Sequence, residues 1–215
     1  KRQLFSKGHT IGVFQFESSG MREFLKKLQP TVLEDLIAMN ALYRPGPMSN
    51  IDDFISRKHG KKKIAYPHPL MEPILKETYG IIVYQEQVMQ IANEIAGFTL
   101  AEADIMRRAM GKKIKSLMDE LSIKFVSGAE QRGIQKKKAE EIFSLIEKFA
   151  QYGFNKSHAA AYAIIAYQTA YLKCHFPNEF FAASMTMDIS NQNKLSEFYE
   201  ELKRLDINIV RPNIN

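Results

Sequence analysis

The strongest chemical signal in the sequence is a group of four basic residues within seven positions. Arg107, Arg108, Lys112 and Lys113 lie on either side of Gly111, and no acidic residue interrupts them. Arg108 and Lys112 are four residues apart and share one face of a helix. Cations near a helix C-terminus offset the macrodipole, which accounts for one or two of the charges. The remainder favours phosphate binding, because arginine makes planar bidentate contacts with phosphate oxygens.

A second candidate is the segment 154–158, whose sequence is FNKSH. Gly153 gives the preceding backbone conformational freedom, and Ser157 is a good N-cap for the helix that follows. The free N–H groups of that helix start would form an anion site, with Lys156 and His158 beside it. The spacing leaves two interpretations open: such an anion site, or a Ser-capped loop with a solvated lysine.

The sequence lacks the residue patterns that metal binding, two-metal phosphoryl transfer or nucleophilic catalysis would need. The five histidines are not paired with one another or with cysteine at zinc-site spacing, so no metal site is predicted. Glu102 and Asp104 are two apart on a predicted helix and therefore diverge, whereas two-metal phosphoryl transfer needs acids on one face. Ser157 and His158 also diverge, and no nucleophile motif is present. We expect no catalytic residue within this chain.

The elements that position these residues are predicted to be helical, so we expect an all-α fold. A capping box of Thr99 and Glu102 opens the helix that ends near Gly111. The helix predicted over 159–176 is apolar nearly all round, which is typical of the buried centre of an α domain. Its cysteine, Cys174, is expected to be a buried, inert thiol. A short hairpin over residues 11–16 is compatible with the pattern. The remaining helices are predicted over 51–58, 70–79, 85–96, 114–132, 135–151, 178–187 and 193–204.

Composition sets the broad class. The chain has 215 residues, 45% of them hydrophobic, which suits one ordinary domain or one domain with a small appendage. A single cysteine indicates a reducing cytoplasm. The net charge of +6 permits a polyanionic partner. The longest apolar run, 159–166, is shorter than the ~20 residues of a membrane helix, so no membrane association is expected. The missing initiator methionine suggests an excised fragment.

Several longer motifs carry a family resemblance. The sequences YGIIVYQEQVM (79–89), MRRAMGKK (106–113) and YGFNKSHAAAY (152–162) resemble the α subunit of bacterial DNA polymerase III, a replicative C-family polymerase. The order agrees as well, because GVFQFES (12–18) leads and ALYRPGP (41–47) follows it. The similarity covers nearly the whole chain, from about Gly12 onward, and corresponds to the fingers region.

The resemblance implies a helical fingers domain over 1–188, followed at 189–215 by the last helix and the beginning of a further subdomain that the sequence cuts short. In this family the fingers close over the incoming dNTP. Arg44 is expected to face the active site, and Gln85 and Gln87 to serve structure or template contact. The residues expected to bind the triphosphate are Arg107, Arg108, Lys112, Lys113, Asn155, Lys156 and His158.

The resemblance also implies what must come from elsewhere. The palm, with the aspartates that bind Mg²⁺ in the intact enzyme, is absent, so the isolated fragment should be inactive and needs no cofactor itself. Implied partners are dNTP, primer-template DNA, the rest of the polymerase chain and replisome subunits such as the sliding clamp, reached through absent parts. Two other classes stay open: a non-catalytic nucleic-acid-binding helical module and a scaffold that docks protein partners.

Overall fold

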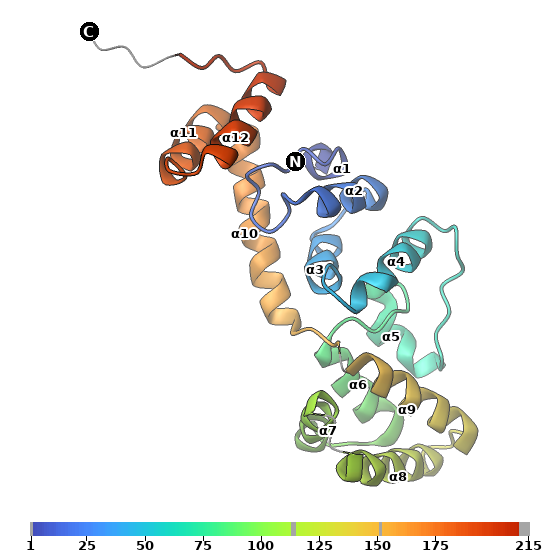
Figure 1. The fold of residues 1–215 in the computed structure, drawn as a ribbon. Coiled ribbons are helices and arrows are strands. Elements are labelled where there is room, and N and C mark those ends of the chain that lie inside the picture. Colours follow the sequence, from blue (N-terminus) through green and yellow to red (C-terminus); the bar gives the residue numbers. More distant parts are fainter. Residues whose placement is uncertain (1, 113–114, 151, 211–215) are drawn as a thin grey trace. The chain divides into compact units, whose positions relative to one another are not determined.

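The computed structural model describes residues 2–112, 115–150 and 152–210. Within these ranges the chain forms twelve α-helices and no β-strand (Figure 1), so the predicted all-α class is confirmed. None of the helices described is long and apolar enough to cross a membrane. The helices are α1 Arg2–Ser6, α2 Ser19–Leu28, α3 Leu33–Leu42, α4 Ile51–Lys58, α5 Glu72–Leu75, α6 Gln85–Ala96, α7 Leu100–Lys112, α8 Lys115–Gln131, α9 Lys136–Ala150, α10 Lys156–His175, α11 Pro177–Met187 and α12 Gln192–Arg204.

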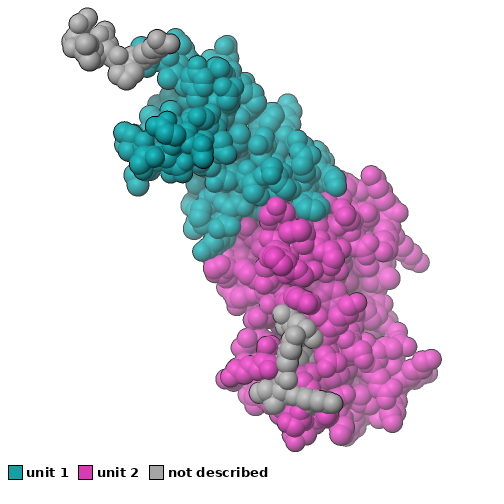
Figure 2. All heavy atoms as spheres, viewed as in Figure 1, with its two compact units in different colours: residues 1–35, 161–215 teal, residues 36–160 magenta. Residues whose placement is uncertain are grey.

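The chain divides into two compact units, coloured separately in Figure 2. Unit 1 consists of Lys1–Asp35 and Ala161–Asn215, and unit 2 consists of Leu36–Ala160. The helix α10 therefore begins in unit 2 and continues in unit 1. The domain boundary near residue 188 that the resemblance implies stays a prediction.

Unit 2 is built around a core shared by α6, α7, α8 and α9. Its apolar side chains recur at helical spacing, as in Val88, Ile91 and Ile95 of α6, all fully buried or nearly so. Phe125 of α8 is fully buried in this core, with its ring 5.4 Å from that of Phe143 on α9. This core fixes α6, which carries Gln85 and Gln87, and α7, which carries Arg107, Arg108 and Lys112.

Unit 1 contains a buried ion pair. The ammonium group of Lys173 on α10 lies 2.5 Å from the carboxylate of Glu201 on α12, and both side chains are almost fully buried. The same ammonium donates hydrogen bonds of 2.8 Å to the carbonyl oxygens of His9 and Ile11. Because every donor of this buried charge is used, the pair anchors the N-terminal segment on α10 and α12.

The predicted hairpin over residues 11–16 is wrong. That segment forms successive turns, closed by hydrogen bonds from Val13 N to Thr10 O and from Phe16 N to Val13 O. Gly12 and Gln15 have φ angles of 78° and 62°, in the left-handed region. A backbone with two such residues cannot continue as an extended strand.

Helix α10 forms as predicted, but it is not the buried centre of the fold. Burial follows a stripe of alanines, Ala159, Ala163, Ala166 and Ala170, each at most 1% exposed. The opposite face remains exposed although it is apolar, with Ile164, Ile165 and Leu172 among its residues. Cys174 is also exposed, so its predicted burial is wrong. Hydropathy summed around a helix cannot tell which face packs, whereas small side chains mark the face that permits close approach.

We predict that Ala163→Asp lowers the free energy of unfolding by more than about 3 kcal/mol, because it buries an unpaired charge. Ile165→Asp is the matched control, since it places the same side chain two residues on at a position that is 41% exposed. Urea denaturation of both variants measures the difference. Equal stabilities would contradict the alanine stripe as the packed face.

A second prediction concerns Gly128, where α8 meets the end of α6. A Cβ atom there would lie 2.2 Å from the carbonyl oxygen of Ala96, a backbone atom that cannot swing away. We expect Gly128→Ala to destabilise the chain by about 1–3 kcal/mol through overpacking. Gly111→Ala is the control, because its Cβ would meet nothing within 4 Å. This change should raise the free energy of unfolding by a few tenths of a kcal/mol. Thermal denaturation that ranks the two variants in the opposite order would refute the contact.

Candidate functional site

The site is organised by a short backbone junction within unit 2. Tyr84, just before α6, and Phe154, just before α10, form a parallel β-bridge. Its hydrogen bonds run from Phe154 N to Val83 O, at 3.1 Å, and from Gln85 N to Phe154 O, at 2.9 Å. The junction therefore holds the start of α10 beside the start of α6.

The approach to α6 is fixed by Gln87, which is only 2% exposed. Its carbonyl oxygen accepts hydrogen bonds from the backbone N–H groups of Val83 and Tyr84, at 2.9 and 3.0 Å. Its amide nitrogen donates to the hydroxyl of Thr78 at 2.9 Å and to the carbonyl oxygen of Ile74 at 3.2 Å. All the polar capacity of Gln87 is thus spent inside the fold, which makes its role structural.

The other side of the 152–154 loop lies against Arg44 and the turn that follows it. Arg44 donates one hydrogen bond to the carbonyl oxygen of Tyr152 and another, of 2.9 Å, to that of Ala41. Its guanidinium lies 4.5 Å from the ring centroid of Phe154, and burial lowers its pKa. Gly46, at φ 98°, has no room for a side chain, because a Cβ would come within 2.6 Å of the Tyr152 ring.

Helix α10 begins one residue earlier than its predicted cap. Asn155 precedes the helix, and its side-chain oxygen accepts a hydrogen bond of 2.8 Å from His158 N, so Asn155 is the cap. Ser157 lies within the first turn, and its predicted capping role is wrong. The position predicted for an anion is filled by the Glu86 carboxylate, which accepts from Lys156 N at 3.0 and 3.1 Å and from the Asn155 amide at 2.9 Å.

Lys156 and His158 emerge from this first turn of α10. The Lys156 ammonium forms an ion pair of 2.7 Å with Glu77. It lines a cavity of about 430 Å³ between the 73–77 segment and α6. The His158 ring packs edge-on against the ring of Phe154, with 5.3 Å between their centroids.

Helix α7 begins at the predicted capping box, which is confirmed. Thr99 N donates to Glu102 at 2.8 Å, and Glu102 N donates back to the Thr99 hydroxyl at 3.3 Å. Hydrogen bonds from Lys124 and then from Thr99 lower the pKa of Glu102 to about 2. The cap fixes the start of the helix and therefore the direction in which its later residues point.

The two arginines of α7 share one acidic partner. Asp104 lies 2.7 Å from Arg107 and 2.8 Å from Arg108. The hydrogen bond from Arg107 is the main reason that the pKa of Asp104 is lowered. The Arg108 side chain is 60% exposed, and Lys112 is exposed at the end of the helix. Lys113 lies outside the described residues.

Gln85 connects the two basic elements. Its side-chain oxygen accepts a hydrogen bond of 3.3 Å from Arg107 Nη1, and its amide nitrogen donates one of 3.0 Å to Gly153 O. The arginines of α7 and the loop before α10 are therefore joined through one side chain. The cations are evident in the sequence, but their acidic partners are not. Asp104 has a visible signal in its i+3 and i+4 spacing to the arginines, whereas Glu77 and Glu86 have none.

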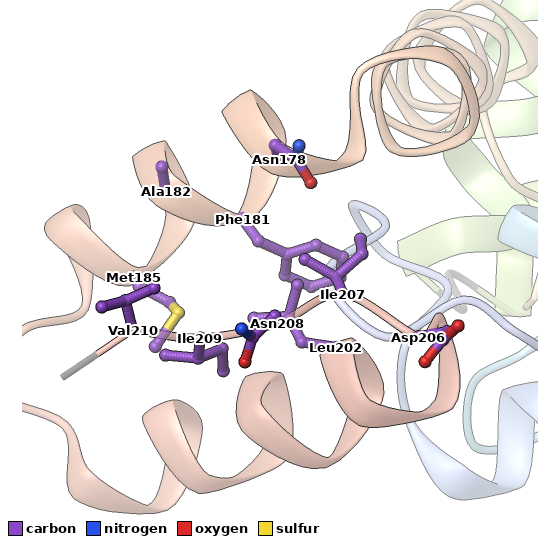
Figure 3. Close-up of a pocket in the computed structure, with 10 residues that line it drawn as sticks. All are labelled: Asn178, Phe181, Ala182, Met185, Leu202, Asp206, Ile207, Asn208, Ile209 and Val210. Atoms are coloured by element: carbon purple, nitrogen blue, oxygen red, sulfur yellow. The ribbon is translucent and has the colours of Figure 1, made fainter.

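A separate cavity of about 580 Å³ lies in unit 1, between α11, α12 and the segment after α12 (Figure 3). Apolar side chains such as Phe181, Met185 and Leu202 point into it. None of its ten lining residues is a lysine or arginine, so it does not resemble a phosphate site. Among the residues described, no group of three His, Cys, Asp or Glu side chains is placed to hold a metal ion.

Comparison with known proteins gives consistent matches. The family profile described as bacterial DNA polymerase III alpha subunit finger domain matches residues 2–133. The DNA polymerase III subunit alpha of Borreliella burgdorferi is 54% identical over 212 residues, which cover 99% of this chain and 18% of that protein. The corresponding subunit of Caulobacter vibrioides is 54% identical over 213 residues, covering 99% of this chain and 19% of the relative.

The chain thus spans less than a fifth of the length of these relatives. The matches run through all the elements of the site, from the turn after Arg44 to the start of α10. The chain belongs to the bacterial DNA polymerase III alpha subunit finger domain family.

Proposed function

We propose that this chain is the part of a DNA-directed DNA polymerase that binds the triphosphate of the incoming deoxynucleotide. The observation that carries the proposal is the link through Gln85, because it joins the basic end of α7 to the start of α10 within one compact unit. The proposed triphosphate ligands are Arg107, Arg108, Lys112, Lys113, Asn155, Lys156 and His158.

The ion pairs of the site suggest how binding would proceed. Asp104 and Glu77 hold Arg107, Arg108 and Lys156 as carboxylate pairs. A triphosphate offers more acceptor oxygens and more negative charge than a carboxylate, so its phosphates would take over these donors. The carboxylates keep the cations ordered beforehand, which reduces the entropy lost when the nucleotide binds.

The contribution of these residues to nucleotide transfer would be electrostatic. Preplaced cations that meet the charge developing on the triphosphate lower the barrier by positioning and charge stabilisation. Helix α10 extends the first turn that carries Lys156 and His158 into a helix of 20 residues. A supporting element of this kind holds ligand groups more firmly than a free loop.

Metal chemistry would come from other parts of the polymerase. Among the described residues, no three His, Cys, Asp or Glu side chains converge where they could hold a metal ion. We propose that Mg²⁺ is bound by palm aspartates outside these residues and that the isolated chain is inactive. The proposed partners are primer-template DNA, the remaining polymerase chain and, through other parts of that chain, replisome subunits such as the sliding clamp, all in the bacterial cytoplasm.

The proposal predicts that Arg108→Ala in the intact polymerase slows single-turnover incorporation by about 10- to 1000-fold, the scale of losing one electrostatic donor. The measurement is made over a range of dNTP concentrations with primer-template affinity followed separately. Lys138→Ala is a matched control, because Lys138 is also an exposed cation paired with an acid on its own helix.

Two results would count against the proposal. Normal incorporation by the Arg108 variant would remove this side chain from nucleotide binding. A loss confined to primer-template affinity would instead make the end of α7 a surface that tracks the DNA backbone.

A further inference from the structure

The side chain of Gln85 is engaged at both ends by different elements. Its oxygen meets Arg107 on α7, while its nitrogen meets the carbonyl oxygen of Gly153 in the loop before α10. Its own backbone N–H donates to Phe154 O at 2.9 Å. A glutamine amide provides one acceptor and a donor at opposite corners, which a carboxylate or an alkyl side chain does not.

The loop has little freedom to move relative to Gln85. A Cβ atom added at Gly153 would lie 3.2 Å from Gln85 Cγ, so the side chain lies directly against the loop backbone. On the other side, Arg44 holds the Tyr152 carbonyl and covers the Phe154 ring. Gln85 and Arg44 both hold the loop, but only Gln85 also contacts an arginine of α7.

Neighbouring polar residues do not make the same connection. Gln87 spends its amide on the turn before α6 and on Thr78. Glu86 contacts the start of α10 through Asn155 and Lys156 N. Gln87 and Glu86 each stabilise one element. Gln85 instead connects two elements, α7 and the loop before α10, which the proposed function places at one triphosphate.

We propose that Gln85 is a positioning residue, which sets Arg107 and the Lys156 loop at the separation that a single triphosphate requires. This inference rests on the proposed function. Gln85 itself would touch no nucleotide and would act through Arg107 and through the loop before α10. Displacement of ligand groups by about 1 Å costs up to 100-fold in rate, so losing the link should reduce turnover more than it reduces stability.

A double-mutant cycle in the intact polymerase tests the inference. Gln85→Met keeps the length of the side chain and removes both hydrogen-bonding ends. We expect it to lower the maximum single-turnover rate by about 10- to 100-fold, with melting temperature and primer-template affinity unchanged. In an Arg107→Ala background the same change should cost clearly less than it does in the wild-type background, because only the contact with Gly153 remains to be lost. Gln131→Met, at an exposed position on α8, controls for the substitution itself.

A conservative variant separates positioning from folding. Gln85→Glu keeps an acceptor for Arg107 and loses the donor to Gly153, so its rate should fall between those of wild type and Gln85→Met. A Gln85→Met enzyme with a normal rate, or with equal losses in both backgrounds, would overturn the inference while leaving the proposed function intact. If Arg107→Ala and Arg108→Ala both incorporate normally, the proposed function fails and this inference fails with it.

Discussion

The structure of the candidate site depends on one backbone junction, the parallel pairing of Tyr84 with Phe154. It brings the start of α10 against the start of α6, and α6 in turn shares its core with α7. Because backbone groups make the pairing, the loop must approach very closely, and Gly46 and Gly153 leave the necessary space. Arg44 then holds the loop from the opposite side. The placement of Lys156 and His158 follows from that pairing.

Local features of the fold were predictable because local chemistry determines them. The helix over 51–58 and the Thr99 capping box need only neighbouring residues, and both appear as expected. The cap of α10 was mispredicted because Asn155 and Ser157 are both competent caps, and the backbone pairing of Phe154 decides between them. The prediction that α10 is buried nearly all round failed for a different reason. Its hydropathy is nearly uniform around the helix, so only tertiary packing distinguishes the alanine face.

The candidate cations could be recognised in the sequence, but the side chains that surround them could not. Clustered arginines and lysines stand out in a sequence, whereas the carboxylate that meets each one often comes from a distant segment. Glu86 reaches the start of α10 across 70 positions of sequence, and no spacing rule anticipates that contact. Gln85 illustrates the same limit, since an uncharged residue within a motif gives no indication that it bridges two helical elements.

The acidic partners also determine how the site appears to a ligand approaching from solution. Arg107, Arg108 and Lys156 are balanced in number by Asp104, Glu77 and Glu86. The electric field of these six groups therefore decays over short distances, so these groups add little long-range attraction to the encounter. Selection among polyanions would then occur after contact, where the number and geometry of phosphate oxygens decide whether the carboxylates are displaced.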